Sequence, residues 1–108
     1  MKIRDALPAD WRAIEAMLRA CELPLEGAHD HRGDFLVFER ENVVAGCVGA
    51  ELYGDAALLR SLAVAEDARG SGVGHALVET MLSRLKARKV QTIALLTSLR
   101  ICVLPQFQ

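Results

Sequence analysis

Two segments of the chain carry apolar residues at the three- and four-residue spacing typical of an amphipathic helix. The first follows Pro8 and Asp10, which suit a helix start, and Pro24 is expected to end it; its apolar positions are Trp11, Ile14, Met17, Leu18 and Cys21. The second runs over residues 72–89, and its last turns are rich in lysine and arginine, which favour the negative end of the helix dipole. Its apolar positions are Leu77, Val78, Met81, Leu82 and Leu85.

Shorter apolar or alternating runs predict β-strands at residues 3–6, 35–39, 43–52, 57–64 and 90–97. Glu41-Asn42 and Gly54-Asp55 separate the second, third and fourth runs and suit tight turns, so these three runs are expected to form an antiparallel meander. Strand, helix and strand then follow in succession over residues 57–97, which implies a parallel crossover. The predicted fold class is α/β (α+β), a mixed sheet with a β-meander followed by a β-α-β crossover.

Residues 25–33 form a polar, poorly periodic segment that is expected to be a loop or a short helical turn. His29 and His31 stand two residues apart in it, but without cysteines or clustered acids they favour loop polarity over a metal site. The three cysteines are far apart and fit neither a disulfide framework nor a C-x-x-C site, and Cys47 is expected to be a buried small apolar residue. No metal is expected.

Composition predicts one domain over residues 1–108, because 108 residues with 52% hydrophobic content can bury a single core. The formal net charge of −1 provides no broad basic field, so nucleic acid and anionic membranes are not expected as partners. No apolar run is long enough to span a bilayer, and the first residues lack the apolar stretch of a signal peptide. A cytoplasmic location is therefore expected.

Candidate chemistry lies between the fourth predicted strand and the second predicted helix. Gly70, Gly72 and Gly74 fall within five residues, which lets the backbone turn tightly and approach a ligand closely. A helix amino terminus follows, and Arg69 supplies a cation, so this segment is expected to bind a phosphate group.

Two better-known glycine motifs do not fit this segment. A G-x-G-x-x-G pattern would need glycine at His75, or glycine or alanine at Leu77. A Walker-type loop would need glycine and lysine where His75 and Ala76 stand. Dinucleotide and nucleotide-triphosphate motifs are thereby excluded on spacing.

The pattern Arg69-x-x-Gly72-x-Gly74, preceded by Leu62-x-Val64 and followed by an amphipathic helix, resembles the acetyl-CoA motif of GNAT N-acetyltransferases. The resemblance extends to about Thr97. It implies acetyl-CoA as cosubstrate, with the pantetheine arm on the backbone of Leu62, Ala63 and Val64. It also implies that the pyrophosphate binds the amides of Arg69, Gly70, Ser71, Gly72, Val73 and Gly74. A backbone amide of the same strand would stabilise the oxyanion.

Residues 47–55 and 57–64 are similar to the branch labelled arsenic-resistance N-acetyltransferases, which is close to amino-acid acetyltransferases. This similarity implies transfer to a small-molecule amine, either an amino acid or an amino-acid-like toxicant. Two alternatives stay open, a non-catalytic CoA-binding module and a structural dimeric domain without a ligand.

Direct attack by an amine needs a route for its proton. Deprotonating a lysine-like amine at pH 7 costs about 4 to 5 kcal/mol and an α-amine about 1 kcal/mol, so the demand on a base depends on the acceptor. Glu51 is the candidate base, with a solvated edge carboxylate as the alternative; Tyr53 and Arg60 are candidate substrate contacts. An inward-facing Arg60 would need a carboxylate partner, whereas an outward-facing one would be an ordinary surface residue.

The end of the chain departs from the family pattern. Many relatives place a tyrosine after the strand that matches residues 93–97, but the only tyrosine here is Tyr53. Relatives also continue with a helix and two strands, so the sheet is expected to be truncated after its fifth strand, with an atypical tail at residues 98–108. Pairing of the fifth strand with residues 101–104, or with a second subunit in a homodimer, would cover its apolar surface.

Overall fold

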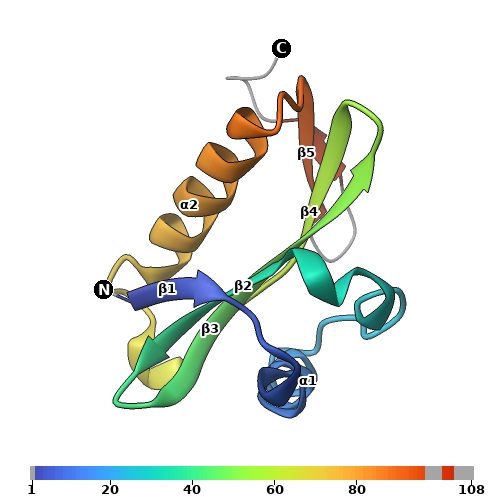
Figure 1. Ribbon diagram of the computed structural model, residues 1–108. Helices are drawn as coiled ribbons and strands as arrows, with labels where there is room; N and C mark the ends of the chain where they lie inside the picture. The colour runs from blue at the N-terminus through green and yellow to red at the C-terminus, as the bar shows by residue number, and fades with distance from the viewer. Residues whose placement is uncertain (1, 97–100, 104–108) are drawn as a thin grey trace.

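The computed structural model describes residues 2–96 and 101–103 and contains one mixed sheet with the strand order β1-β2-β3-β4-β5-β6 (Figure 1). Neighbouring strands pair antiparallel except β4 and β5, which are parallel. The predicted meander and crossover are therefore confirmed. The strands are β1 (Lys2–Asp5), β2 (Phe35–Arg40), β3 (Val43–Tyr53), β4 (Ala56–Val64), β5 (Thr92–Leu96) and β6 (Ile101–Val103).

Both predicted tight turns are present in the meander. Glu41 and Asn42 connect β2 to β3 with φ angles of 51° and 64°, the left-handed conformation of a two-residue hairpin turn. Gly54 begins the turn from β3 to β4 with φ of 63°, a conformation that glycine adopts without steric cost.

The two predicted helices are α1 (Trp11–Ala20) and α2 (Val73–Ala87), accompanied by three 3₁₀ turns. Helix α1 ends before Pro24, contrary to prediction, because Glu22 adopts a φ of 57° and the Leu23 amide bonds to the Leu18 carbonyl at 2.8 Å. This is a Schellman cap, in which a left-handed residue redirects the chain onto the last-turn carbonyls. The 3₁₀ turns are η1 (Pro8–Asp10), η2 (His29–Asp34) and η3 (Glu66–Ala68).

Helix α2 ends with the same device. Lys89 has a φ of 62°, and the Val90 amide donates to the Leu85 carbonyl at 3.0 Å. Val90 thus belongs to the helix cap, which explains why β5 begins at Thr92 and not at residue 90.

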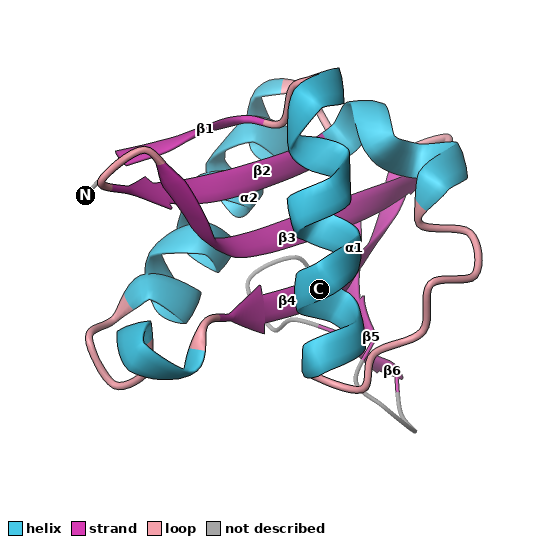
Figure 2. Ribbon diagram, turned by 90° about the horizontal axis from the view of Figure 1, so that it is seen from below, coloured by secondary structure: helices cyan, strands magenta, loops and turns pink. Residues whose placement is uncertain are grey.

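The two helices cover opposite faces of the sheet (Figure 2). Alternating side chains supply both cores, because successive residues of a strand point to opposite faces. On one face, Ile14 and Leu18 of α1 pack with Phe35, Val37, Cys47 and Ala63. On the other face, α2 packs on a larger cluster that includes Leu36, Val48, Ala50, Leu59 and Ile93.

The sheet does not end at its fifth strand, so that part of the prediction is wrong. Strand β6 pairs antiparallel with β5, joining Ala94 to Val103 and Leu96 to Ile101 in register. The predicted pairing of β5 with the tail is confirmed over Ile101–Val103. This pairing supplies partners to backbone groups of β5 that would otherwise form an open strand edge. Residues 98–100 and 104–108 of the predicted tail, and Thr97 of the predicted fifth strand, lie outside the described residues.

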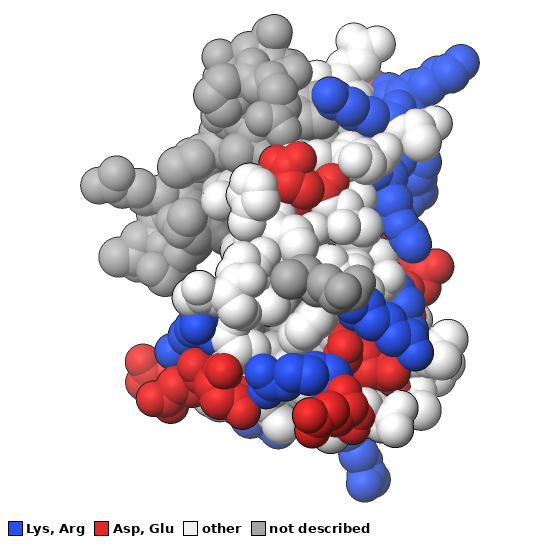
Figure 3. Space-filling view, turned by 90° about the vertical axis from the view of Figure 1, so that its left-hand side faces the viewer, with Lys and Arg blue, Asp and Glu red and all other residues white. Residues whose placement is uncertain are grey.

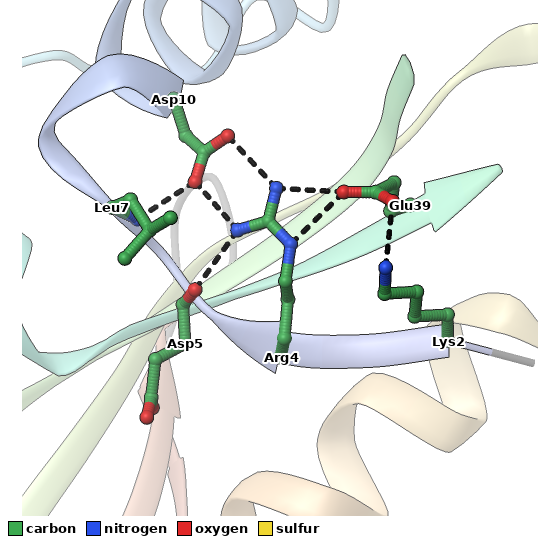
Figure 4. Close-up of polar contacts among 6 residues, drawn as sticks. All are labelled: Lys2, Arg4, Asp5, Leu7, Asp10 and Glu39. Carbon is green, nitrogen blue, oxygen red and sulfur yellow. Dashed lines mark hydrogen bonds and ion pairs between the residues drawn. The ribbon is translucent and has the colours of Figure 1, made fainter. Parts of the chain in front are cut away.

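A polar network fixes β1 to β2 and to η1 (Figure 4). The Arg4 guanidinium donates to both carboxylate oxygens of Asp10, at 2.7 and 3.0 Å, and to Glu39 at 3.0 Å. Lys2 also donates to Glu39, and Asp10 accepts from the Leu7 amide at 2.7 Å. The network holds the start of α1 against the edge of the sheet.

On the face shown in Figure 3, basic and acidic side chains are interspersed along the lower edge, whereas basic side chains gather at the upper right. Among the described residues, no helix is long and apolar enough to cross a membrane.

Candidate active site

Strand β4 separates from β5 halfway along its length. The parallel register joins Ala56–Leu59 to Thr92–Leu95, and β4 then continues to Val64 beyond that ladder. On the β3 side, β4 stays paired to its end, where Val64 faces Gly46. Residues 60–64 therefore present a strand edge toward β5, and this stretch contains Leu62, Ala63 and Val64, the predicted pantetheine contacts.

A β-bulge marks the separation. Cys47 pairs with Ala63 and Gly49 with Arg60, so β4 holds one more residue than β3 in this interval. Ser61 occupies the bulge with φ of 59°, in the left-handed region. Bulges commonly re-aim side chains next to active sites, and this one sets the direction of Arg60 and Ser61.

The glycine-rich loop lies directly between the exposed strand edge and α2. Gly70 and Gly72 have φ angles of 81° and 84°, and the space where a Cβ would lie at each is open. The amide of Ala76 bonds to Gly72 O at 3.0 Å, so the amides of Val73 and Gly74 belong to the first turn, whose donors have no intrahelical partner. The structure thus has the backbone donors and helix terminus expected of a phosphate site.

Two side chains of the predicted loop have contacts of their own. Ser71 Oγ donates to Ala68 O at 2.5 Å and closes the turn onto η3. The Val73 side chain is buried in the core beneath α2, so only its backbone faces the loop. Gly74 is the second residue of α2, where a Cβ would lie 3.7 Å from Val64.

The Arg69 guanidinium lies along the end of β4. Its Nε donates to Val64 O at 3.0 Å and its Nη2 lies 3.4 Å from Cys21 Sγ. Arg69 also borders a hollow of about 440 Å³ between α1 and the end of β4, lined in part by Met17, Cys21 and Val64. The side chain expected to supply a cation to the phosphate site is held on the end of β4, next to the glycine-rich loop.

Glu51 and Arg60 form a buried ion pair on the α1 face of the sheet. Glu51 is 8% exposed and Arg60 5%, and Arg60 Nη1 donates to Glu51 Oε2 at 2.5 Å. The structure therefore supports the inward-facing alternative for Arg60 and excludes a solvated edge for Glu51. Tyr53 donates its hydroxyl to Glu51 Oε1, so the three predicted residues lie together.

Arg60 also organises the chain between α1 and β2. Its Nη2 donates to the carbonyls of Glu26 at 2.6 Å and Pro24 at 3.3 Å, and its Nε to Ser61 Oγ at 3.1 Å. Gly27, with φ of 75°, packs so closely that a Cβ there would lie 2.9 Å from Arg60 Nη1. These bonds fix residues 24–27 over the ends of β3 and β4.

Hydrogen bonding sets the charge states in this cluster. Burial acts to raise the pKa of Glu51, but the hydrogen bond from Tyr53 and the ion pair with Arg60 outweigh it and hold that pKa below its usual range. The same carboxylate raises the pKa of Tyr53. Glu51 is therefore an anion at neutral pH.

His31 joins the cluster from η2, with its Nε2 3.8 Å from Glu51 Oε1 and its ring centroid 6.5 Å from that of Tyr53. From the sequence, His31 and His29 were expected to be polar loop residues, with a metal site as the less favoured alternative. The structure separates the two histidines, since His29 packs edge-on against Trp11 at 5.5 Å. The signal available in the sequence was weak, because no periodicity places a residue of an irregular segment over a particular strand.

Residues 2–100 match the Acetyltransferase (GNAT) family, and the chain belongs to it. Among solved structures, it resembles Rv2747 from Mycobacterium tuberculosis in complex with CoA, with a TM-score of 0.78 and 25% identity over 90% of this chain and 64% of that chain. It also resembles ribosomal-protein-alanine N-acetyltransferase from Brucella melitensis, with a TM-score of 0.72 and 27% identity over 88% of this chain and 73% of that one.

N-acetylglutamate synthase from Neisseria gonorrhoeae, complexed with coenzyme A and N-acetyl-glutamate, shares the fold with a TM-score of 0.80 at 22% identity. The match covers 89% of this chain and 25% of that chain. The chain thus spans less than two thirds of the Mycobacterium and Neisseria proteins. The match therefore does not assign the activity of either whole protein to this chain.

Proposed function

We propose that this protein transfers an acetyl group from acetyl-CoA to the amino group of a small molecule. The observation that carries the proposal is the departure of β4 from β5 after Leu59, which places a strand edge end to end with the helix amino terminus at Gly72. A ligand with an amide-bearing arm and a pyrophosphate has the chemistry that both features bind.

In this proposal, the pantetheine arm adds to the edge of β4 at Leu62, Ala63 and Val64, and the pyrophosphate lies on the amides of Arg69 to Gly74. The arm then runs from the loop back along β4, which brings the thioester toward the bulge at Ser61. A backbone amide of β4 would donate to the oxyanion that develops during attack. Acetyl-CoA bound in this way supplies the activated acyl group.

The acceptor is proposed to be an amino acid or an amino-acid-like toxicant, including arsenicals of the kind suggested by the arsenic-resistance resemblance. Support comes from the position of Glu51, Tyr53 and Arg60 beside the bulge, and from the amino-acid product bound in the Neisseria structure. An α-amine needs only about 1 kcal/mol to deprotonate at pH 7, so it makes a modest demand on a base. Glu51 is the first candidate for that base, and Tyr53 and Arg60 for contacts that orient the acceptor.

The test combines binding and turnover. Acetyl-CoA should raise the melting temperature, and a panel of α-amino acids and their arsenical and phosphinic analogues should release free thiol. Gly72→Asp should abolish the thermal shift, because a carboxylate at the helix start repels the pyrophosphate. The matched control is Gly54→Asp, which places the same residue at a similar φ in open space far along the chain and should keep the shift.

A non-catalytic CoA-binding module is the second candidate. It is favoured by the absence of a second tyrosine in the sequence and by the engagement of Tyr53 with Glu51, which leaves no tyrosine side chain for the leaving sulfur. A thiol with a pKa near 8.5 can leave as thiolate at pH 7 for about 2 kcal/mol, so transfer without that acid is slowed but not prevented. A thermal shift with no thiol release across the panel would establish the module.

We also propose a homodimer, in which a second copy covers the apolar surface of β5. Sedimentation velocity over a hundredfold range of protein concentration tests it. A monomer at every concentration would contradict the dimer without affecting the proposed transfer.

A further inference from the structure

His31, one of the two histidines of η2, has no part in the function proposed so far, although it lies against the candidate acceptor site. His31 is the one residue of η2 with non-helical backbone angles, φ of −114° and ψ of 19°, and this kink turns the chain between two helical turns. Its Nε2 lies 3.8 Å from Glu51 Oε1, within ion-pair range but longer than a direct hydrogen bond. The side chain is 28% exposed, compared with 11% for that of Glu51.

Glu51 is poorly placed to accept a proton itself. Its Oε2 accepts from Arg60 and its Oε1 from Tyr53, so both oxygens already have donors. Its lowered pKa also gives little driving force for taking a proton from an amine. A carboxylate held in this way is better suited to orient and stabilise a neighbouring cation.

We propose that His31 is the proton acceptor for the attacking amine and that Glu51 is the positioning residue that holds its imidazole. The proposal rests on the transferase function proposed above, and it assigns the role of base to His31 in place of Glu51. Imidazole is the side chain whose ordinary titration range lies closest to neutral pH, where a general base is most effective.

In the reaction, the amine nitrogen attacks the thioester carbon and forms the C–N bond, while the C–S bond breaks and its electron pair leaves with sulfur. The proton lost by the amine moves to the unprotonated ring nitrogen of His31, whose Nε2 lies 3.8 Å from Glu51 Oε1. The imidazolium is stabilised by the Glu51 anion and passes its proton through solvent to the thiolate. Amine and thioester become amide and thiol without any further reactant.

The described groups that face the imidazole are Glu51 and Tyr53 from β3, with Arg60 from β4 behind Glu51. Asp30 precedes it on η2 itself. Arg60 binds Oε2 of Glu51, whereas the His31 ring faces Oε1. Arg60 therefore neutralises only part of the negative charge that Glu51 presents to the imidazole. The cluster is thus ordered as base, orienting carboxylate and buried cation.

The experiment measures kcat and KM between pH 5 and 9 for the best amine of the panel, in the wild type and in His31→Gln. The wild type should lose activity on the acid side as the base becomes protonated. His31→Gln should lose that limb and lower kcat about 100-fold, with little change in KM, because general-base catalysis contributes 10² or more and acts after binding. The variant changes a partly exposed side chain, and an unchanged melting temperature with acetyl-CoA verifies its fold.

Two further variants separate the roles. His29→Gln makes the same substitution two residues away, on the histidine that packs against Trp11, and should retain the acid limb. Glu51→Gln should keep measurable activity, because it removes the group that positions the imidazole and leaves the proton acceptor in place. A His31→Gln enzyme that retains the wild-type limb and kcat, with Glu51→Gln inactive at every pH, would overturn the proposal in favour of Glu51 as base. A wild type that binds acetyl-CoA but acetylates no amine would overturn the transferase function and this proposal with it.

Discussion

Gly49 leaves room for the ring of Phe35 in the core on the α1 face because it has no Cβ. Gly49 of β3 lies under the ring of Phe35, and a Cβ built at this position would be 2.5 Å from two atoms of that ring. Phe35 is also 1% exposed and packs edge-on against Trp11 at 5.4 Å, so the ring has little room to move. Close packing of this kind makes even one added carbon costly.

Gly49→Ala is therefore expected to lower the free energy of unfolding by about 1–3 kcal/mol, the usual range for overpacking a core. Gly33→Ala is the control, since Gly33 has nothing within 4 Å of the added carbon. Urea denaturation of the two variants measures the difference. Equal stabilities would contradict the packing described for Phe35.

Cys47 illustrates how burial removes the reactivity of a side chain. It is 0% exposed, and burial raises the pKa of its thiol to about 12. Its Sγ also donates to the Ser61 carbonyl at 3.3 Å, beneath the bulge. The expectation of a buried apolar cysteine is confirmed.

Because the thiolate is the reactive form, Cys47 is expected to resist Ellman's reagent in the folded protein. Cys47→Ala should then release as much nitrothiobenzoate as the wild type under native conditions and one equivalent less in denaturant. A native-state difference of a full equivalent between the two proteins would show that the strand opens.

At the scale of elements, the network around Arg4 joins β1, β2 and η1. Because two of its members are carboxylates, the stability that it contributes depends on pH in the acid range. The hydrogen bonds from Arg4 lower the pKa of Asp10, and those from Lys2 and Arg4 lower the pKa of Glu39. A carboxyl group with a lower pKa in the folded state contributes stability above its unfolded pKa, near 4, and loses it as pH falls through the folded value.

Stability of the wild type is accordingly expected to fall between about pH 5 and pH 3 more steeply than that of Arg4→Met, in which Asp10 loses its main partner and Glu39 keeps Lys2 but loses Arg4. Arg12→Met serves as the control, because Arg12 is an exposed arginine of α1 outside this network. Chemical denaturation at several pH values measures the slope. Added salt should narrow the gap, since the pairs are partly exposed.

The elements with a regular apolar pattern could be predicted from the sequence. The places where the backbone conformation depends on distant contacts could not. Helix periodicity located α1 and α2, but not the Schellman caps at Glu22 and Lys89, because non-glycine residues in that conformation have no strong sequence signal. The same limit applies to the bulge at Ser61, which turns Arg60 toward Glu51. The tight turn at Gly70 and Gly72 was predictable, because both residues adopt positive φ angles that glycine accepts without steric cost.

The arrangement of the site residues could not be predicted, since it depends on pairing across the sheet and on an irregular segment. Glu51 and Arg60 meet because antiparallel pairing of β3 and β4 places Gly49 opposite Arg60. Residues 24–31 reach the same place because Arg60 binds the carbonyls of Pro24 and Glu26 and because Leu25 and Ala28 pack in the core on the α1 face. No pattern within residues 25–33 encodes that contact.

At the scale of the whole molecule, the strand edge of β4 and the amino terminus of α2 form one continuous binding path in the proposed function. The path predicts that acetyl-CoA slows amide hydrogen exchange in two neighbouring segments together, residues 61–64 and residues 69–76. Exchange slows wherever a ligand supplies a hydrogen-bond acceptor or blocks local opening. Peptides from β2, on the far side of β3, should keep their rates and serve as the internal control.

ADP separates the two halves of that path, because it carries a pyrophosphate but no pantetheine arm. It should slow exchange only in residues 69–76, where the loop amides bind phosphate, and leave residues 61–64 as in the protein without ligand. Protection by acetyl-CoA that also stops at the loop would mean that β4 does not receive the arm as an added strand. In that case the separation of β4 from β5 after Leu59 would serve the packing of the sheet, and the thioester would have to be sought away from Glu51 and His31.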